Sequence, residues 1–545
     1  STGRLLSKNG QWAIGEQTVI YSLAFAYACP DSRHYRNDDV RQAAIRNGDA
    51  LRAYQNPDGS VDFTKSDGSV WGPTFMPWPV YPWVEAFRIL RDELDAGRRS
   101  NWERGLRLWA EHIHQTLPTE RVHNIPAYNA AILARLSQVL NEPAWMDTAR
   151  QYILHTIEQQ QPDGFWAEGG CPTTLYNLVY VNAVGLYYCF TKDDAALPAL
   201  TRALDFHIHF TYPNGVCVET VDGRVKYEGK PSFFGLPAWI HFSDGRALLD
   251  VLLRRLDDQP SDEAHRAIIA LHPSFVAGCE RHPGGDAPLI PQTAAEYRAI
   301  RNGRALVRKS GDWFYCLNGY TVPDACRHRR LQSRWLMDMQ NLLSVWHRSA
   351  GLIIGGGNSK QQPQFSTFSV TAGGRSFLTP DSIDLNTQDG RDILTARYGD
   401  AVCRLDIHLE PDGSLLAITV ACDADSAADI TARLTLVDLD GKDAVIEGLD
   451  APPCRLKGLS TWSAAIQASN ALRIGSTRIE APDGAAFDWP EYPFNPYAIN
   501  NASASDHAVG CVSLQLTPGD KPQRVLIRVN DSVVEPRTGK KRRSV

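Results

Sequence analysis

The first half of the chain places apolar residues three and four positions apart, which is the spacing of amphipathic helices. The predicted helices are separated by loops rich in Gly, Pro and aromatic residues. These helices cover residues 17–27, 40–54, 83–94, 101–115, 127–140, 145–159, 176–188, 196–206 and 243–256.

Two of the predicted helices end in similar turns. The first turn is Gln55-Asn-Pro-Asp-Gly59 and the second is Gln161-Pro-Asp-Gly164. Pro and Gly both favour a helix stop at such positions. A repeat of helix, turn, aromatic loop and helix is typical of a ring of helical hairpins, whose loops gather on one rim. Asp-Gly turns are also common by coincidence, which is the alternative explanation.

The pattern changes beyond residue 272. Pro, Gly and small residues predict a linker over 273–294. Short alternating apolar runs then predict strands of an antiparallel β-sandwich over 295–545. The clearest predicted strands are 305–309, 313–317, 342–347, 365–370, 401–409, 415–420, 430–436 and 524–529. We therefore expect an α+β multidomain protein, with an α/α toroid over 1–272 followed by the sandwich.

Composition narrows the class of protein. The 545 residues exceed what one hydrophobic core usually holds. A net charge of −6 argues against broad nucleic-acid binding, and no apolar stretch approaches the roughly 20 residues of a membrane span. The 11 cysteines form no Cys-x-x-Cys pair, so no zinc site is predicted. We expect a periplasmic or secreted location, with a signal segment absent from this chain, and a homo-oligomer is compatible with the sequence.

The first candidate site residues are His123 and Asn124, which precede a strongly amphipathic helix. At a helix N-terminus, an amide side chain and the backbone N–H groups can bind a carboxylate. The alternative is that Asn124 only caps the helix.

A second segment, Asp163–Tyr180, leads from a Gly-rich aromatic loop into another helix. Tyr176 and Tyr180 are four residues apart and therefore share a helical face. A Tyr hydroxyl of depressed pKa can abstract a proton or protonate a leaving oxygen. Glu168 is a candidate for binding sugar hydroxyls. The alternative is an aromatic stripe of the helix core.

A third segment, Val70–Trp83, is a Pro-rich loop with several aromatic residues. Trp71, Trp78 and Tyr81 could stack on sugar faces. Alternatively, these rings fill the centre of the toroid.

The remaining candidates are polar residues in or near the predicted sandwich. Arg334, Asn341 and His347 lie in an apolar setting, and His347 could equally be a core histidine. Arg224 could supply positive charge to an anionic sugar, or could be a solvated charge in a hairpin turn.

These residues resemble the toroid-plus-β-sandwich polysaccharide lyases, in particular the heparinase II/III-like and exo-type alginate lyase group. In that group a His/Asn-bearing loop precedes one helix, and His123-Asn124 resembles it. A later Asp-Gly…Glu…Tyr segment opens another helix, and Asp163-Gly164…Glu168…Tyr176 resembles that. This chain has His before Asn, and the gap from Glu to Tyr is longer than in that group.

The resemblance implies β-elimination on a uronic-acid-containing polysaccharide or oligosaccharide, without a metal or organic cofactor. Asn124, with His123 or Arg334, would neutralise the uronate carboxylate and so stabilise the enolate that forms when the C5 proton leaves. Tyr176 or His347 would act as the base, because a sandwich His is often the second acid/base of the group. Tyr176 could also return a proton to the departing O4.

Two other functions are compatible with the sequence. A glycoside hydrolase on a similar toroid would need two carboxylates, and Glu168, Asp163, Glu219 and Asp58 are available. A saccharide-binding protein without catalysis would keep the aromatic residues but would tolerate the loss of Tyr176 and His123.

Overall fold

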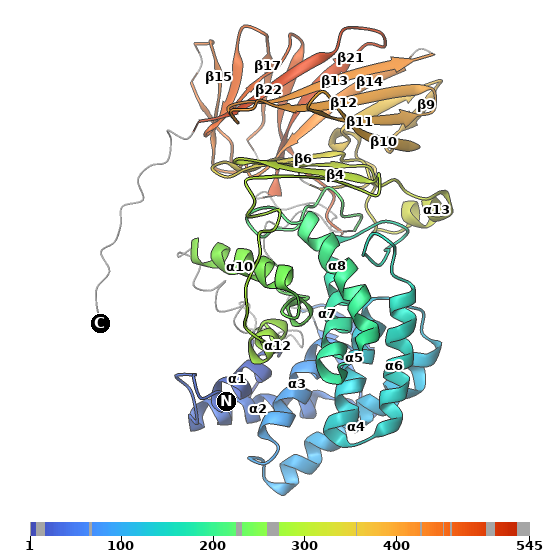
Figure 1. Ribbon diagram of the computed structural model, residues 1–545, viewed down its shortest axis with the longest axis vertical. Coiled ribbons are helices and arrows are strands. Elements are labelled where there is room, and N and C mark those ends of the chain that lie inside the picture. The colour runs from blue at the N-terminus through green and yellow to red at the C-terminus, as the bar shows by residue number, and fades with distance from the viewer. Residues whose placement is uncertain are drawn as a thin grey trace, which may run out of the picture. The chain divides into compact units, whose positions relative to one another are not determined.

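Figure 1 shows the computed structural model, which divides into two compact units. The first unit comprises residues 1–166, 175–208 and 231–290, and the second comprises 167–174, 209–230 and 291–545. The structure describes residues 2–6, 17–64, 68–224, 232–258, 272–355, 357–425, 428–450, 452–457, 460–496 and 507–530.

The first unit is helical, as its apolar spacing predicts. Each of the nine predicted helices is present. Their ends lie within four residues of the expected ones, except that the third helix begins six residues earlier and the fourth five residues earlier. The helices are α1 (Val19–Ala28), α2 (Asp38–Tyr54), α3 (Pro77–Leu90), α4 (Ala96–Thr116), α5 (Asn124–Leu140), α6 (Pro143–Glu158), α7 (Thr174–Thr191), α8 (Leu197–His209), α9 (Leu236–Trp239), α10 (Ser243–Asp258) and α12 (Pro273–Arg281).

The expected Pro-rich loop over 70–83 is instead a strand followed by the first turns of α3. Strands β1 (Val61–Thr64) and β2 (Val70–Thr74) pair as an antiparallel hairpin. Helix α3 then begins at Pro77. Proline lacks a backbone N–H, but at the first position of a helix this group would have no helical partner in any residue. The prolines therefore mark a helix start and not the predicted loop.

The expected linker over 273–294 begins with helix α12, which belongs to the first unit. The side chain of His272 accepts a hydrogen bond from Ser274 N at 3.2 Å and caps this helix, and Pro273 occupies its first position. A Cβ on Gly278 would approach Leu236 Cγ to 2.6 Å, so close packing requires the small residues of this helix. Those small residues gave the segment the composition of a linker.

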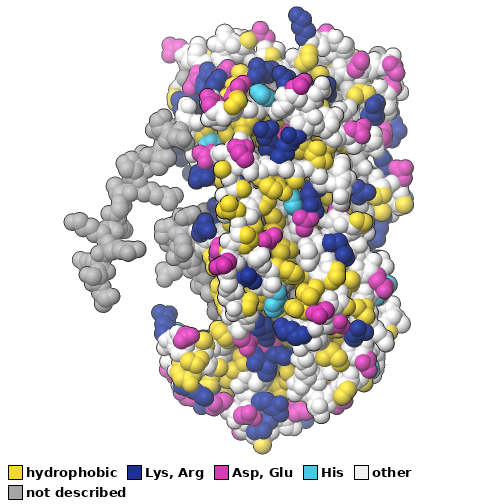
Figure 2. Space-filling view, in the orientation of Figure 1, with side chains coloured by type: hydrophobic (Ala, Val, Ile, Leu, Met, Phe, Trp, Pro, Cys, Tyr) yellow, Lys and Arg dark blue, Asp and Glu magenta, His cyan; other side chains and the backbone are white. Residues whose placement is uncertain are grey.

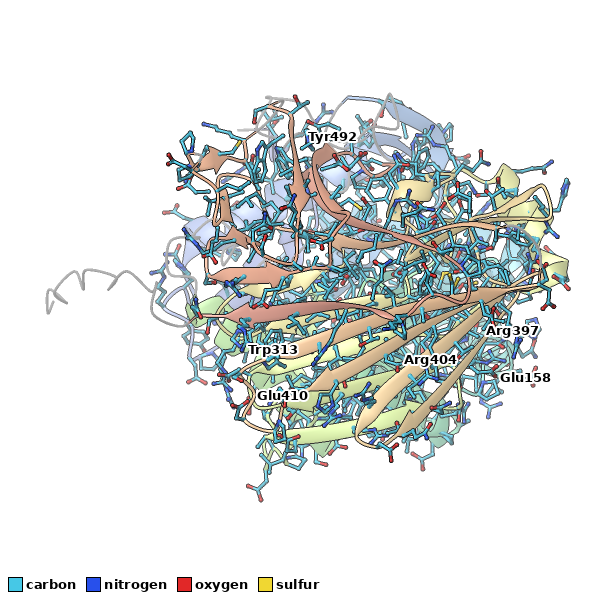
Figure 3. The ribbon with its side chains drawn as sticks, turned by 90° about the horizontal axis from the view of Figure 1, so that it is seen from above. Glu158, Trp313, Arg397, Arg404, Glu410 and Tyr492 are labelled. Carbon is cyan, nitrogen blue, oxygen red and sulfur yellow. The ribbon has the colours of Figure 1, made fainter. Side chains whose placement is uncertain are left out.

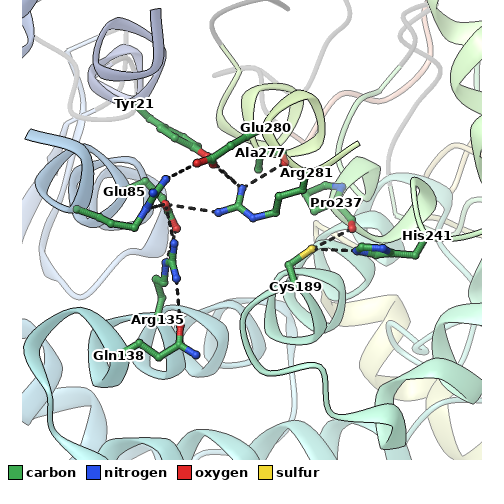
Figure 4. Close-up of polar contacts among 11 residues, drawn as sticks. Tyr21, Glu85, Arg135, Gln138, Cys189, Pro237, His241, Ala277, Glu280 and Arg281 are labelled. Carbon is green, nitrogen blue, oxygen red and sulfur yellow. Dashed lines mark hydrogen bonds and ion pairs between the residues drawn. The ribbon is translucent and has the colours of Figure 1, made fainter. Parts of the chain in front are cut away.

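A buried ionic cluster joins α12 to α3 and α5 (Figure 4). Glu85 on α3 is fully buried, and Arg135 on α5 donates to it at 2.7 Å. Arg88 donates to Glu85 at 2.7 Å and to Glu280 on α12 at 2.5 Å. Arg281 lies 3.6 Å from Glu85. Every carboxylate of the cluster thus contacts more than one guanidinium, which is the geometry a buried charge needs.

The second unit is a sandwich of two antiparallel sheets, which confirms the predicted fold class. One sheet has the order β10-β11-β12-β13-β22-β19-β18-β15-β16, and the other has β17-β20-β21-β14-β7-β6-β5-β4-β3. Figure 3, seen from above, shows neighbouring strands of the first sheet, with Arg397 on β11 and Arg404 on β12. Alternate side chains of both sheets fill one core, which includes Leu405, Ile418 and Val512.

The sandwich begins one residue after its predicted start. Its strands are β3 (Glu296–Arg301), β4 (Ala305–Ser310), β5 (Trp313–Asn318), β6 (Leu343–His347), β7 (Gly351–Ile354), β8 (Phe368–Ala372), β9 (Arg375–Phe377), β10 (Ser382–Gln388), β11 (Arg391–Tyr398), β12 (Ala401–Leu409), β13 (Leu416–Ala424), β14 (Ala428–Leu436), β15 (Asp443–Glu447), β16 (Cys454–Arg455), β17 (Trp462–Ile466), β18 (Ala471–Ile474), β19 (Thr477–Glu480), β20 (Ala485–Glu491), β21 (Val509–Leu516) and β22 (Gln523–Val529). The second unit also contains helix α13 (Asp324–Gln332), which the strand pattern did not predict.

The surface carries charges of both signs. Acidic and basic side chains are intermixed on the face drawn in Figure 2, in keeping with the net charge of −6. Among the helices that the structure describes, none is long and apolar enough to cross a bilayer.

Candidate active site

In the first unit, helices α5 and α7 lie side by side and run in the same direction. Tyr128 on α5 lies beside the Asn182 side chain on α7. Further along both helices, the Arg135 guanidinium lies 4.6 Å from the centre of the Phe190 ring. Gln138 Nε2 then donates to Phe190 O at 2.8 Å. Because the contacts advance together on both helices, the two N-terminal ends lie at the same end of the pair.

Helix α3 also packs against α5. The Trp78 and Tyr81 rings each lie 6.0 Å from the Tyr128 ring, and Glu85 contacts Arg135 two turns later. Helices α3, α5 and α7 are therefore parallel, and all three begin at one end of the unit. Trp78, Asn124 and Tyr176, which stand in the first turns of these helices, are brought to that end.

At this end, α5 begins with the predicted His-Asn pair. His123 occupies the N-cap position, makes no side-chain capping bond, and is half-buried. Asn124 is the first helical residue and is 6% exposed, with its Oδ1 3.4 Å from His123 Nδ1. The alternative in which Asn124 caps the helix is therefore wrong. Unpaired backbone N–H groups of a helix start favour a negative charge beside these two side chains.

The first turn of α7 is anchored beside Tyr176. Tyr176 is half-buried, whereas the next residue, Asn177, is fully buried. Asn177 Oδ1 accepts a hydrogen bond from Trp166 N at 2.9 Å, and its Nδ2 lies 2.9 Å from His207 Nε2. Since an amide nitrogen can only donate, His207 Nε2 is the acceptor and the ring is neutral with its proton on Nδ1. Asn177 and His207 thereby hold the backbone that carries Tyr176.

The neutral state of His207 has a consequence for stability. Burial lowers the pKa of His207 to about 3, from 6.5. The unfolded chain therefore binds a proton below pH 6.5 that the folded chain excludes, so the stabilising contribution is complete above pH 6.5 and is lost as the pH falls towards 3. We expect His207→Gln to make the free energy of unfolding less dependent on pH, by about 1.4 kcal/mol per pH unit between pH 6 and 4.

Denaturant titrations at several pH values would measure this slope. His155→Gln is the control, because His155 is exposed on α6. An unchanged slope in His207→Gln would show that His207 titrates normally in the folded protein.

The predicted aromatic residues differ in exposure. Trp71 on β2 is 57% exposed and lies 5.2 Å from the Phe63 ring, and Trp78 is half-buried. Tyr81 is fully buried and Tyr180 is 3% exposed, stacked on Trp166 at 5.3 Å. Trp71 and Trp78 therefore offer ring surface to a ligand, whereas Tyr81 and Tyr180 are part of the helix packing.

In the second unit, the structure brings Glu168 and Arg224 together. Arg224 donates to Glu168 at 2.7 Å, and both side chains are mostly buried. Glu168 begins a tight turn in which its backbone pairs with Cys171, and Gly169 and Gly170 between them have φ of +59° and +86°. Glycine adopts two such angles in succession at the lowest cost. A Cβ would also lie 2.5 Å from Leu336 Cδ1 if placed on Gly169, and 2.7 Å from Cys326 Sγ if placed on Gly170. The turn therefore requires the Gly-Gly sequence that follows Glu168.

Asp222 and Asn358 hold the segment that carries Arg224. The buried Asp222 carboxylate accepts from Arg224 N at 2.8 Å and from Thr174 N at 2.7 Å, where α7 begins. Asn358 Nδ2 donates to Thr220 O and Asp222 O, both at 3.0 Å. Neither residue was a sequence candidate, because no local pattern distinguishes them. Each holds the segment through a hydrogen bond to a residue far away in the chain, which is 48 positions away for Asp222 with Thr174 and 136 positions away for Asn358 with Asp222.

The other three candidates of the second unit lie apart from one another. Asn341 is buried two residues before β6. It lies near the segment of Asp222, since its N–H donates to Asn358 Oδ1 at 3.0 Å. His347 ends β6, about 20 Å away at 3.3 Å per residue. It is buried 4.6 Å from the Trp313 ring, and its Nδ1 accepts from Ser349 N. Arg334 is an exposed residue beside Trp335 and donates to Pro496 O. His347 is therefore not grouped with Glu168 and Arg224.

Among the described residues, no group of three or more His, Cys, Asp or Glu side chains could hold a metal ion.

No known family profile matches the sequence, and no curated protein sequence matches it either. The fold is similar to the Streptomyces coelicolor A3 chondroitin AC lyase in complex with chondroitin sulphate, with a TM-score of 0.53 and 11% identity over 95% of this chain and 74% of that one. A tyrosine-to-alanine mutant of the same lyase matches with a TM-score of 0.50, 11% identity and the same coverages. The heparan sulfate lyase HepC of Pedobacter heparinus matches with a TM-score of 0.47 and 10% identity over 94% and 76%. The chain thus has the helical-toroid-plus-β-sandwich fold of polysaccharide lyases.

Proposed function

We propose that this protein is a polysaccharide lyase that cleaves a uronic-acid-containing saccharide by β-elimination. The observation that carries the proposal is the parallel arrangement of α3, α5 and α7, since it gathers Trp78, Asn124 and Tyr176 at one end of the helical unit. An aromatic ring, a carboxylate-binding helix start and a proton-transfer group are what elimination from a uronate requires. Solved structures of this fold include a lyase in complex with chondroitin sulphate, an anionic saccharide.

Each residue has a defined role in the proposed reaction. Asn124, His123 and the N-terminal N–H groups of α5 bind the uronate carboxylate, which stabilises the enolate formed at C5. Tyr176, reacting as the phenolate, takes the C5 proton and becomes the phenol. The electron pair of the C5–H bond forms the C4–C5 double bond, and the C4–O4 bond breaks. The same Tyr can return a proton to the departing O4.

Each unit carries a feature suited to saccharide binding: the exposed rings in the first unit and one ion pair in the second. Trp71 and Trp78 stack on sugar faces through their open surfaces. Glu168 accepts hydrogen bonds from sugar hydroxyls, and Arg224 presents a positive charge to an acidic group. Each of these two side chains already orients the other through the 2.7 Å contact.

The direct test is a panel of acidic polysaccharides incubated with the purified protein. We expect at least one polymer to release products that absorb in the near ultraviolet, because elimination leaves a conjugated unsaturated uronate. Saccharides without a uronate serve as the control. Reducing ends released without new absorbance would indicate hydrolysis instead, and saturable binding without any product would indicate a binding protein.

A further inference from the structure

The second unit contains a buried guanidinium that the proposed reaction does not use. Arg330, on α13, is 2% exposed. Its NH1 donates to Glu168 O at 3.0 Å and to Gly169 O at 3.2 Å. Its NH2 donates to Gly223 O at 2.8 Å and to Met337 O. Four backbone carbonyls from three separate segments therefore converge on one side chain.

The acceptors of this buried charge are neutral carbonyl groups. A guanidinium removed from water costs several kcal/mol unless its environment compensates it. Carbonyl oxygens supply partial negative charge. Burial raises the pKa of the nearby Asp338 carboxyl, and the Arg330 charge is among the groups that oppose this rise. The planar five-donor fork of Arg can reach two segments at once, which the single ammonium of Lys cannot do in the same geometry.

Two of the three bound segments carry the ion pair of the candidate site. Arg330 bonds the carbonyl of Glu168 itself and the carbonyl of Gly223, the residue before Arg224. The fit is close, since a Cβ on Gly223 would lie 2.8 Å from Arg330 NH2, and one on Gly169 would lie 3.2 Å from Arg330 NH1. A shift of the guanidinium would therefore move both segments.

The helix that carries Arg330 is itself held in place. Lys360 Nζ donates to Arg330 O and, at 3.0 Å, to Leu336 O. The C-terminal end of α13 and the residues after it are thus tied to the segment that follows β7. The guanidinium is fixed from its own backbone as well as from its acceptors.

We propose that Arg330 is a positioning residue that sets the distance and orientation of Glu168 and Arg224. This inference rests on the proposed function for its catalytic consequence, but the positioning itself is a property of the second unit. Removal of the guanidinium would release both segments, while the ion pair would keep its charges.

Hydrogen–deuterium exchange tests the positioning without any substrate. In Arg330→Ala we expect peptides covering 167–174 and 219–224 to exchange about tenfold faster than in the unaltered protein, with peptides from α3 and α5 unchanged. Arg329→Ala is the matched control, because Arg329 is the exposed neighbour on the same helix. Equal exchange of these two peptides in Arg330→Ala and Arg329→Ala would overturn the inference.

Steady-state kinetics, measured with an acidic polymer that gives unsaturated product, then test whether this positioning affects the reaction. We expect Arg330→Ala to raise KM by at least tenfold with kcat within about threefold, because Glu168 and Arg224 bind the substrate. Added guanidinium or methylguanidinium should restore part of the loss, and Arg330→Lys is expected to be defective despite its charge. Faster exchange with unchanged KM would contradict the catalytic consequence. If no polymer gives product, the proposed function fails, while the exchange experiment still decides whether Arg330 positions the two segments.

Discussion

Replacing Tyr176 with Phe is expected to lower kcat by about 10²–10⁴-fold, because that range is what a positioned acid or base contributes. The ring and its packing remain, so KM should stay within about tenfold, as expected when an interaction is lost only in the transition state. Tyr176 is half-buried in the first turn of α7, and the neighbouring Asn177 anchors that turn. The measurement is the initial rate of near-ultraviolet product formation over a range of substrate concentrations.

Tyr188→Phe is the matched control for this experiment. Tyr188 lies on the same helix, is also half-buried, and contacts Lys192 and His241 through its ring, which Phe retains. We expect its kcat and KM to be unchanged. Wild-type turnover in Tyr176→Phe would remove Tyr176 from the mechanism and would favour a different proton acceptor.

The largest expected effect on stability comes from Glu85→Gln, with a loss of about 3–5 kcal/mol in the free energy of unfolding. Glu85 is fully buried and contacts the guanidinium groups of Arg88, Arg135 and Arg281. Gln keeps the shape but removes the charge, which leaves an excess of buried positive charge where α3, α5 and α12 meet. Denaturant titration of the whole chain measures the loss.

Glu93→Gln is the control for charge removal without burial. Glu93 pairs with Arg36 at 2.9 Å and Arg41 at 3.6 Å, but both partners reach solvent. Surface pairs of this kind contribute about 0–1 kcal/mol. Equal small losses in Glu85→Gln and Glu93→Gln would mean that the buried cluster does not stabilise the helical unit.

The pH dependence of stability gives a second readout for Glu85. Burial alone would raise the pKa of Glu85, but Arg135, Arg281 and Arg88 outweigh it and lower the pKa below 4.5. The contribution of Glu85 is therefore present above pH 4.5 and is lost as the pH falls through the folded-state pKa. Below pH 4.5, the stability of Glu85→Gln should fall less steeply with acid than that of the unaltered protein.

The fold class could be predicted from the sequence because it depends on local periodicity. Apolar spacing decides whether a segment buries one helical stripe or one face of a strand, and that choice needs no knowledge of partners. Apolar spacing does not identify helices whose small residues are required by close packing against neighbouring segments. Helix α12 was predicted as a linker because Ala277 and Gly278, which pack tightly in the fold, carry little hydrophobic signal.

Sequence patterns likewise identified only some of the residues of the candidate site. His123, Asn124, Glu168 and Tyr176 were recognisable in the sequence because each lies beside a helix start or a Gly-rich turn. Arg330, Asp222 and Asn358 were not, because their partners are distant in the chain and buried. The sequence by itself determined the two kinds of secondary structure and the residues capable of the chemistry. Only the tertiary structure decided which of them share one end of a helix bundle, since parallel packing of α3, α5 and α7 depends on contacts between segments about fifty residues apart.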